Sequence, residues 1–196
     1  MCDTKCFYLT MHKMHQSSPQ TSNYTMSNVS PSTINAVISS YTPGHHIGNN
    51  IILGSLLAFR YPDFFSHCNI KYIFSVKPIP RDVQQVLTSR GINCCYHDIP
   101  HRMFADEFQS LLAQALEIVK LAQTQNCMVF INCRSGQHRS VAICCALLMI
   151  LDGMNYWDAF HHIKSIRACA NPEYPVHILD SIDTSHGLLP TDLYVE

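Results

Sequence analysis

The chain carries little charge, and neither sign is in excess. Lys and Arg together number 13 and Asp and Glu 14, so 14% of the 196 residues are charged and the net charge is −1. Proteins that bind nucleic-acid backbones usually cluster Lys and Arg on one surface, and anchors to anionic membranes use polybasic segments. We therefore expect no nucleic-acid partner and no polybasic anchor.

The sequence also lacks a secretory signal and a bilayer-spanning run. Residues 1–10 show no basic start followed by a long apolar core. The apolar segment Val141 to Leu151 has the length of a buried helix, which is too short to cross a membrane. Without a secretory signal, the ten cysteines favour free thiols over disulfides. We predict a protein without a membrane span that is located in the cytoplasm, or also in the nucleus.

The sequence also lacks the residue spacing that is typical of metal sites. The twelve histidines are scattered, and neither Cys-x2-Cys nor His-Glu-x-x-His occurs. The sequence therefore predicts no metal site, and nothing in it indicates another cofactor.

The chain divides by composition into a tail, a domain and a short second tail. Residues 1–45 are rich in Ser, Thr, Asn, Met and His, and we expect a flexible tail, with a docking or regulatory segment as the alternative. Residues 46–186 form the predicted domain, and 187–196 a C-terminal tail. Within the domain, strands are predicted at 51–53, 71–76, 92–97 and 127–131, and helices at 81–89, 104–123, 139–151, 155–167 and 175–183. This alternation predicts an α/β fold with a mostly parallel central sheet and helices on both faces.

The residues with catalytic potential lie close together in one loop. A short apolar strand ends at Asn132 and Cys133, five residues follow, and Arg139 and Ser140 open an apolar helix. A strand, a glycine-containing loop and a helix N-terminus together form a cradle of amides for an anion. A cysteine at its mouth is favoured as the nucleophilic thiolate, and an arginine fork can hold two phosphoryl oxygens. The pattern indicates a cysteine-dependent phosphatase.

This Cys-x5-Arg-Ser loop resembles that of the protein tyrosine phosphatase superfamily, and the surrounding domain resembles the dual-specificity phosphatases. The resemblance runs in order through residues 51–55, 70–76, 96–100 and 167–172, and it covers about 47–183. It implies a compact catalytic domain that hydrolyses phosphotyrosine and phosphoserine or phosphothreonine in phosphoprotein partners. It also implies a phosphocysteine intermediate.

The same resemblance implies a role for each loop residue. Cys133 would be the nucleophile, Arg139 would hold the equatorial phosphoryl oxygens, and Ser140 would bond the departing thiolate. A simple N-terminal helix cap is the alternative role for Ser140, and the two roles are compatible. The remaining substrate-binding groups would be the backbone amides of Arg134, Ser135, Gly136, Gln137 and His138.

A general acid must come from a separate loop, and two carboxylates qualify. Asp98 lies 35 residues before Cys133, after a strand, at the family's acid position, and it is our candidate. Asp106 is the alternative, although the first turn of a helix also favours a carboxylate for structural reasons.

Asn132 departs from the family pattern, which has His before the cysteine. Asparagine cannot carry a positive charge, so we expect a higher pKa for Cys133 than in relatives with His. This departure keeps a second hypothesis open, a pseudophosphatase that binds phosphoproteins. An RNA 5′-phosphatase, a lipid phosphatase and a rhodanese-like sulfur carrier are weaker alternatives.

Overall fold

The computed structural model describes residues 42–99 and 105–172, without the side chains of Ala105 and Asp106. At its centre is a five-stranded sheet in the order β1-β2-β5-β3-β4. The strands are β1 (Gly44–Gly48), β2 (Ile51–Ser55), β3 (Ile70–Ser75), β4 (Asn93–Tyr96) and β5 (Met128–Cys133). β2, β5, β3 and β4 run parallel to one another, whereas β1 pairs with β2 in the antiparallel direction. The predicted mostly parallel sheet is confirmed.

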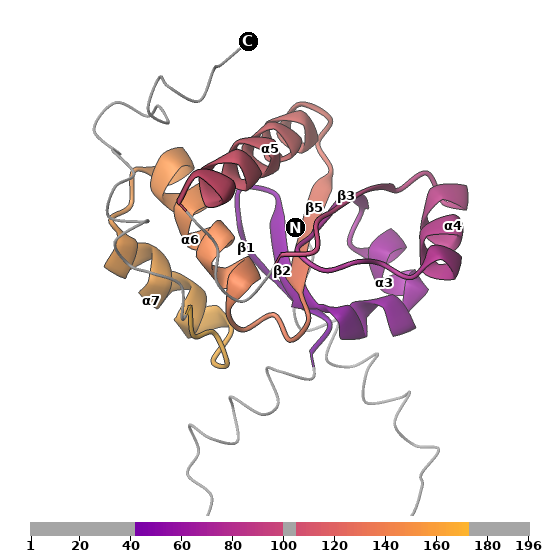
Figure 1. Cartoon of the computed structure of the whole chain (residues 1–196), viewed down its shortest axis with the longest axis horizontal. Helices are drawn as coiled ribbons and strands as arrows, with labels where there is room; N and C mark the ends of the chain where they lie inside the picture. The colour runs from indigo at the N-terminus through magenta and orange to yellow at the C-terminus, as the bar shows by residue number, and fades with distance from the viewer. Residues whose placement is uncertain (1–41, 100–104, 173–196) are drawn as a thin grey trace, which may run out of the picture. The chain divides into compact units, whose positions relative to one another are not determined.

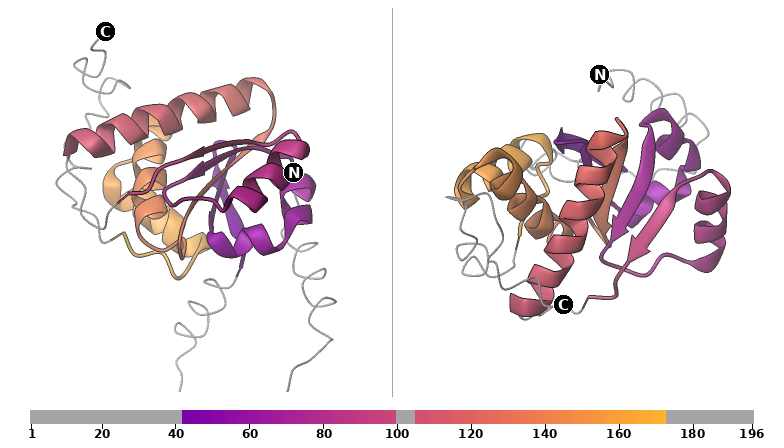
Figure 2. Two further views of the ribbon diagram at one scale, coloured as in Figure 1. Left: turned by 45° about the vertical axis from the view of Figure 1, so that its right-hand side comes forward. Right: turned by 90° about the horizontal axis from the view of Figure 1, so that it is seen from above.

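Helices cover both faces of this sheet (Figures 1 and 2). Three lie together on one face: α5 (Ala105–Thr124), α6 (Arg139–Asp152) and α7 (Tyr156–Ile166). On the other face lie the 3-10 helix η1 (Leu56–Arg60) and the helices α3 (Pro62–His67) and α4 (Arg81–Ser89). The predicted α/β class is confirmed.

Strand β5 contributes buried side chains to the hydrophobic layers on both faces of the sheet. Val129, Ile131 and Cys133 join the large hydrophobic core that includes α5 and α6. The alternate residue Phe130 points the other way, where its ring packs edge-on against Phe65 at a centroid distance of 5.4 Å. Because a strand buried on both faces needs apolar residues at almost every position, β5 reads as a continuous hydrophobic run.

The predicted strands and helices that fall on described residues match the observed ones to within two residues at each end. β1, η1 and α3 were not predicted. The sequence of β1, GHHIG, is poor in β-branched and aromatic residues, and η1 and α3 are only 5 and 6 residues long. β1 also begins two residues before the predicted domain start at 46. The predicted helix at 175–183, the tail at 187–196 and most of the tail at 1–45 lie outside the described residues.

Candidate active site

The loop between β5 and α6 is held by its carbonyl groups. Each carbonyl from residue 134 to residue 138 accepts a hydrogen bond from a donor elsewhere in the protein. The donors, in order, are Leu56 N (3.2 Å), Arg167 Nη2 (3.1 Å), Arg167 Nε (2.8 Å), Asn171 N (2.8 Å) and Ala142 N (3.0 Å). In a planar trans peptide the N–H points opposite to the C=O. The amides of this loop therefore turn inward and form the predicted cradle.

Cys133 lies at the base of this cradle and is 2% exposed. Its Sγ accepts hydrogen bonds from the amide of Gly136 at 3.2 Å and from the hydroxyl of Ser140 at 3.1 Å. Burial alone would raise the pKa of this thiol. The bonds from the Ser140 hydroxyl and from the amides of Ser140, His138 and Gly136 outweigh burial, and the net pKa is lowered from its ordinary value. The site thus favours the thiolate, the nucleophilic form.

Gly136 is required by the path of the loop. Its φ of +66° lies in the left-handed region, and a Cβ there would come within 2.4 Å of the carbonyl oxygen of Gly54. Gly54 in turn packs against the Phe130 ring, which would lie 2.4 Å from a Cβ at that position. Gly136 therefore lets the loop lie directly on β2, whereas Gly54 leaves room for the Phe130 ring and the Pro43 carbonyl.

Arg139 begins α6 and is 7% exposed. Its Nη1 donates a hydrogen bond of 2.6 Å to the carbonyl of Ile99. A guanidinium carries five N–H donors, so this bond is compatible with a fork of Nε and Nη2 on two phosphoryl oxygens. Ser140 is not the helix cap considered above, because the N-cap of α6 is His138.

Asp98 precedes Ile99 in the chain, and the Ile99 carbonyl accepts the hydrogen bond from Arg139. The backbone of the candidate acid is therefore one residue away from this contact. The Asp98 side chain is 64% exposed and forms an ion pair with Lys77. Asp106 is the second residue of α5, and its side chain lies outside the described residues.

Arg167 is a site residue for which sequence reasoning proposed no role. It is fully buried, and its guanidinium binds the carbonyls of Ser135 and Gly136, the carbonyl of Thr42 and the Nδ1 of His45. One planar side chain therefore fixes two loop carbonyls and ties them to β1. The sequence signal was its place in the family-like segment 167–172, which by itself indicates resemblance and not function.

A family model described as "Dual specificity phosphatase, catalytic domain" matches residues 51–179. This is more than half of the chain, and it includes β2, the loop and Arg167. The chain belongs to the dual-specificity phosphatase family. A curated relative is the protein-tyrosine-phosphatase MKP1 of Arabidopsis thaliana, 29% identical over 68 residues, which are 35% of this chain and 9% of that protein.

Solved structures of this family share the fold. Human DUSP28 superposes with a TM-score of 0.61 at 20% identity, covering 75% of this chain and 97% of that one. DUSP15 gives a TM-score of 0.63 at 18% identity, with coverages of 76% and 91%. The human tyrosine phosphatase-like serine/threonine/tyrosine-interacting protein gives 0.61 at 22% identity, with coverages of 73% and 97%. At these identities the likeness shows the fold alone.

Asn132 precedes Cys133 in this phosphatase domain and is fully buried. Its Nδ2 donates to Ser75 Oγ at 3.1 Å and to the Cys133 carbonyl at 3.4 Å. Its Oδ1 is buried without a hydrogen-bond partner among the described residues. The asparagine thus connects β5 to β3 with one end of its amide only.

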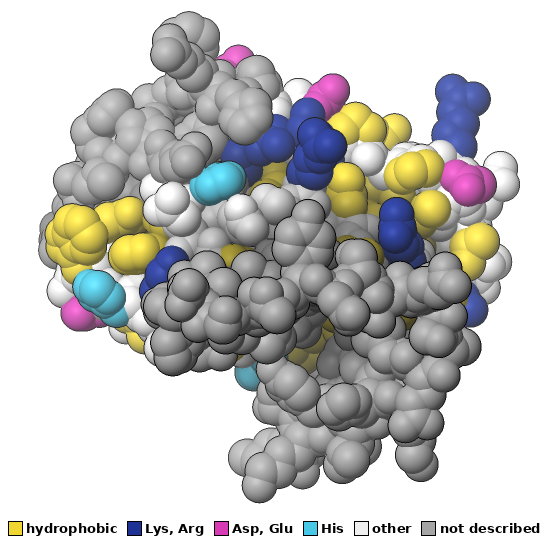
Figure 3. Space-filling view, turned by 90° about the horizontal axis from the view of Figure 1, so that it is seen from below, with side chains coloured by type: hydrophobic (Ala, Val, Ile, Leu, Met, Phe, Trp, Pro, Cys, Tyr) yellow, Lys and Arg dark blue, Asp and Glu magenta, His cyan; other side chains and the backbone are white. Residues whose placement is uncertain are grey.

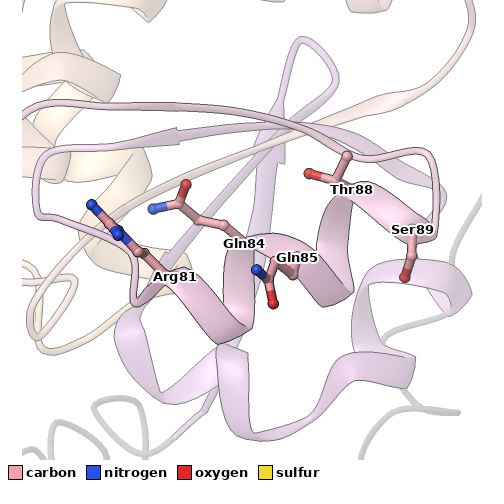
Figure 4. Close-up of a pocket in the computed structure, with 5 residues that line it drawn as sticks. All are labelled: Arg81, Gln84, Gln85, Thr88 and Ser89. Carbon is pink, nitrogen blue, oxygen red and sulfur yellow. The ribbon is translucent and has the colours of Figure 1, made fainter.

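A separate hollow lies on α4, on the opposite face of the sheet from α5 and α6. Its volume is about 580 Å3, and it is lined by Arg81, Gln84, Gln85, Thr88 and Ser89. Figure 4 shows these polar side chains along a single helix. Because no loop residue lines it, we place the phosphatase site in the amide cradle and not here.

Within residues 42–99 and 105–172, no three side chains of His, Cys, Asp or Glu lie close enough to hold a metal ion.

In the same part of the chain, no single helix is long and apolar enough to cross a membrane. α6 and α7 reach the necessary length and apolar composition only when taken together, across a bend of 119°.

Proposed function

We propose that this phosphatase domain hydrolyses phosphotyrosine and phosphoserine or phosphothreonine in proteins, through a phosphocysteine intermediate. The observation that carries the proposal is the cradle itself. The amides of Gly136, His138 and Ser140 bond Cys133 Sγ, and the buried Arg139 follows the loop directly at the start of α6. These donors stabilise negative charge both on the thiolate and on a phosphoryl group bound above it.

The reaction would proceed in two displacements. The Cys133 thiolate attacks phosphorus, so that an S–P bond forms while the P–O bond to the leaving group breaks. Asp98 gives its proton to the departing oxygen. Water then attacks the phosphocysteine, Asp98 takes a proton from that water, and the S–P bond breaks. The Ser140 hydroxyl stabilises the thiolate as it leaves, from the position 3.1 Å from Sγ that it already occupies.

The lowered pKa of Cys133 supports an enzyme over a phosphoprotein-binding pseudophosphatase. Binding alone needs amides and an arginine, whereas a stabilised thiolate serves a nucleophile. Asn132, which lacks the charge of histidine, is the feature that keeps the pseudophosphatase as the alternative.

Surface charge supports protein substrates over RNA ends or highly phosphorylated lipids. Figure 3 looks at the side where β5 passes into α6, and on the described surface the Lys and Arg side chains lie at several separate places among hydrophobic side chains. Polyanionic substrates are better matched by a continuous basic surface.

Turnover of an aryl phosphate and of phosphotyrosine and phosphoserine peptides tests the proposal. We expect multiple turnovers by the native chain, none by Cys133→Ser, and a loss of roughly 10²-fold or more for Asp98→Asn, the usual contribution of a general acid. Native protein that binds phosphopeptide without turnover would instead establish the pseudophosphatase.

A further inference from the structure

Ser75 joins the strand of the nucleophile to the strand that leads to the acid. β3 lies between β5 and β4, and Ser75 is its last residue, fully buried and paired with Asn132 on one side and Tyr96 on the other. Its Oγ accepts from Asn132 Nδ2 at 3.1 Å, and its carbonyl accepts from the amide of His97 at 2.8 Å. Ser75 therefore contacts the residue immediately before Cys133 and the residue immediately before Asp98.

The same hydroxyl fixes the backbone of Lys77. Ser75 Oγ donates to the Lys77 carbonyl at 2.7 Å and accepts from the Lys77 amide at 3.3 Å. All hydrogen-bonding groups of this hydroxyl are thereby engaged. These bonds fix the turn after β3 relative to the nucleophile, and Lys77 lies in this turn.

Lys77 directs its ammonium to the candidate acid. Nζ donates to Oδ1 of Asp98 at 2.5 Å, and the two side chains are 28% and 64% exposed, respectively. Among the described residues, Lys77 is the only hydrogen-bond partner of the Asp98 carboxyl group, which is otherwise at the surface. The Ile99 backbone is held separately by Arg139 at 2.6 Å.

We propose that Lys77 is a positioning residue for proton transfer by Asp98. The position of Lys77 is itself fixed by the hydrogen bonds that Ser75 makes with the Lys77 backbone and with Asn132. The proposal rests on the phosphatase function proposed above and assigns a residue to its acid step. With Oδ1 held by Nζ, the transferable proton resides on Oδ2 of Asp98.

The chemistry explains why a cation suits this position. As the P–O bond of the leaving group breaks, the Oδ2 proton moves to the departing oxygen and negative charge develops on Asp98. An ammonium already at Oδ1 stabilises this developing charge more than it stabilises the neutral carboxyl group, so it lowers the barrier to proton transfer. In the second displacement it holds the carboxylate that accepts the proton of water.

Dependence on the leaving group tests this role, because only a poor leaving group needs the acid. We expect Lys77→Met to lower kcat/KM, which reports the first displacement, roughly tenfold for phenyl phosphate, a part of the whole contribution of a general acid. It should change kcat/KM for 2,4-dinitrophenyl phosphate by less than about twofold, since that leaving group departs as an anion. Lys77→Arg keeps a cation and should recover most of the rate.

Two controls separate this role from a structural one. Lys71→Met makes the same change at an exposed position on β3 and should leave both rates unchanged. In an Asp98→Asn background, Lys77→Met should have no further effect, because there is no acid left to position. Exposed ion pairs add little to stability, so the variants should fold normally.

Three outcomes would overturn the inference. Equal losses with both substrates, or the same loss in the Asp98→Asn background, would reject Lys77 as a positioning residue while the phosphatase function stands. No turnover of 2,4-dinitrophenyl phosphate by the native chain would reject the phosphatase function and this role with it.

Discussion

Among the described residues, Ser140 is the one whose hydroxyl bonds the Cys133 sulfur. It is fully buried and its Oγ lies 3.1 Å from Cys133 Sγ. A hydrogen bond to a charged group contributes about 1.5–3 kcal/mol. Ser140→Ala should therefore raise the pKa of Cys133, while the amide bonds of the cradle remain.

The pH dependence of Cys133 alkylation by iodoacetamide, followed by peptide mass spectrometry, measures this change. Ser165→Ala on α7 is the matched control, because that hydroxyl bonds only the His162 carbonyl among the described contacts. An alkylation midpoint that is the same for Ser140→Ala as for the native chain would contradict the prediction.

At this scale the sequence predicted some residues of the site and not others. Cys133, Arg139 and Ser140 lie within eight positions, so their chemistry is visible as a pattern. Lys77 lies in the turn after β3 and Arg167 at the end of α7, and their hydrogen-bond partners are set by how the chain packs. No spacing rule connects residues that meet only when strands pair in a particular order. The comparison of the Cys133 pKa with relatives that have His in place of Asn132 stays a prediction.

The loop from Cys133 to Arg139 acts as one element, and Gly136 limits its conformation. Gly136 and Gly153 have nearly the same φ, +66° and +65°, but a Cβ at Gly153 would meet nothing within 4 Å. Replacing either by Ala costs about 1–2 kcal/mol from the backbone conformation alone. Gly136→Ala additionally forces a Cβ against the Gly54 carbonyl, and we expect about 1–3 kcal/mol more loss of unfolding free energy.

Urea unfolding of both variants, together with aryl phosphate turnover, checks this prediction. Gly153→Ala should keep native turnover, whereas Gly136→Ala should lose it, because the displaced loop turns amides away from the phosphoryl group. Equal destabilisation by the two substitutions would show that the loop moves off β2 without cost.

The helices and strands that the sequence predicted are those with a clear apolar period or run. α5 and β5 bury their apolar residues in the core and could be located to within two residues. β1 could not, because its only buried residue is Ile47 and its place in the sheet depends on pairing with β2. β1 matters nonetheless, since its His45 receives a bond from Arg167.

The fold as a whole was predictable because four parallel strands separated by helices permit few arrangements. The antiparallel edge strand was not, since a parallel sheet is stable with or without it. Its contribution is a connection: Arg167 binds Thr42 and His45 on one side and the loop carbonyls of Ser135 and Gly136 on the other. Folding of the β1 edge and the geometry of the cradle are therefore linked through one buried guanidinium.

This link predicts how the stability of the molecule depends on pH. Burial, and secondly the charge of Arg167, lower the pKa of His45 to about 4 from 6.5. The unfolded chain thus binds a proton between these values that the folded chain does not. The contribution of His45 to the free energy of unfolding is complete above about pH 6.5. It is lost as the pH falls toward about 4, and the loss is at most about 3 kcal/mol. The pKa of His46 is lowered as well, which adds in the same direction.

His45→Gln separates this contribution from acid unfolding in general. Glutamine offers a carbonyl oxygen to Arg167 Nη1 and does not titrate, so the variant should lose less unfolding free energy than the native chain between about pH 7 and about pH 4.5. Urea unfolding across that range, with fitted m-values to verify that both chains unfold alike, measures the difference. Parallel curves for the two proteins would mean that His45 accepts its proton without disturbing Arg167, and that β1 and the cradle are not linked through this pair.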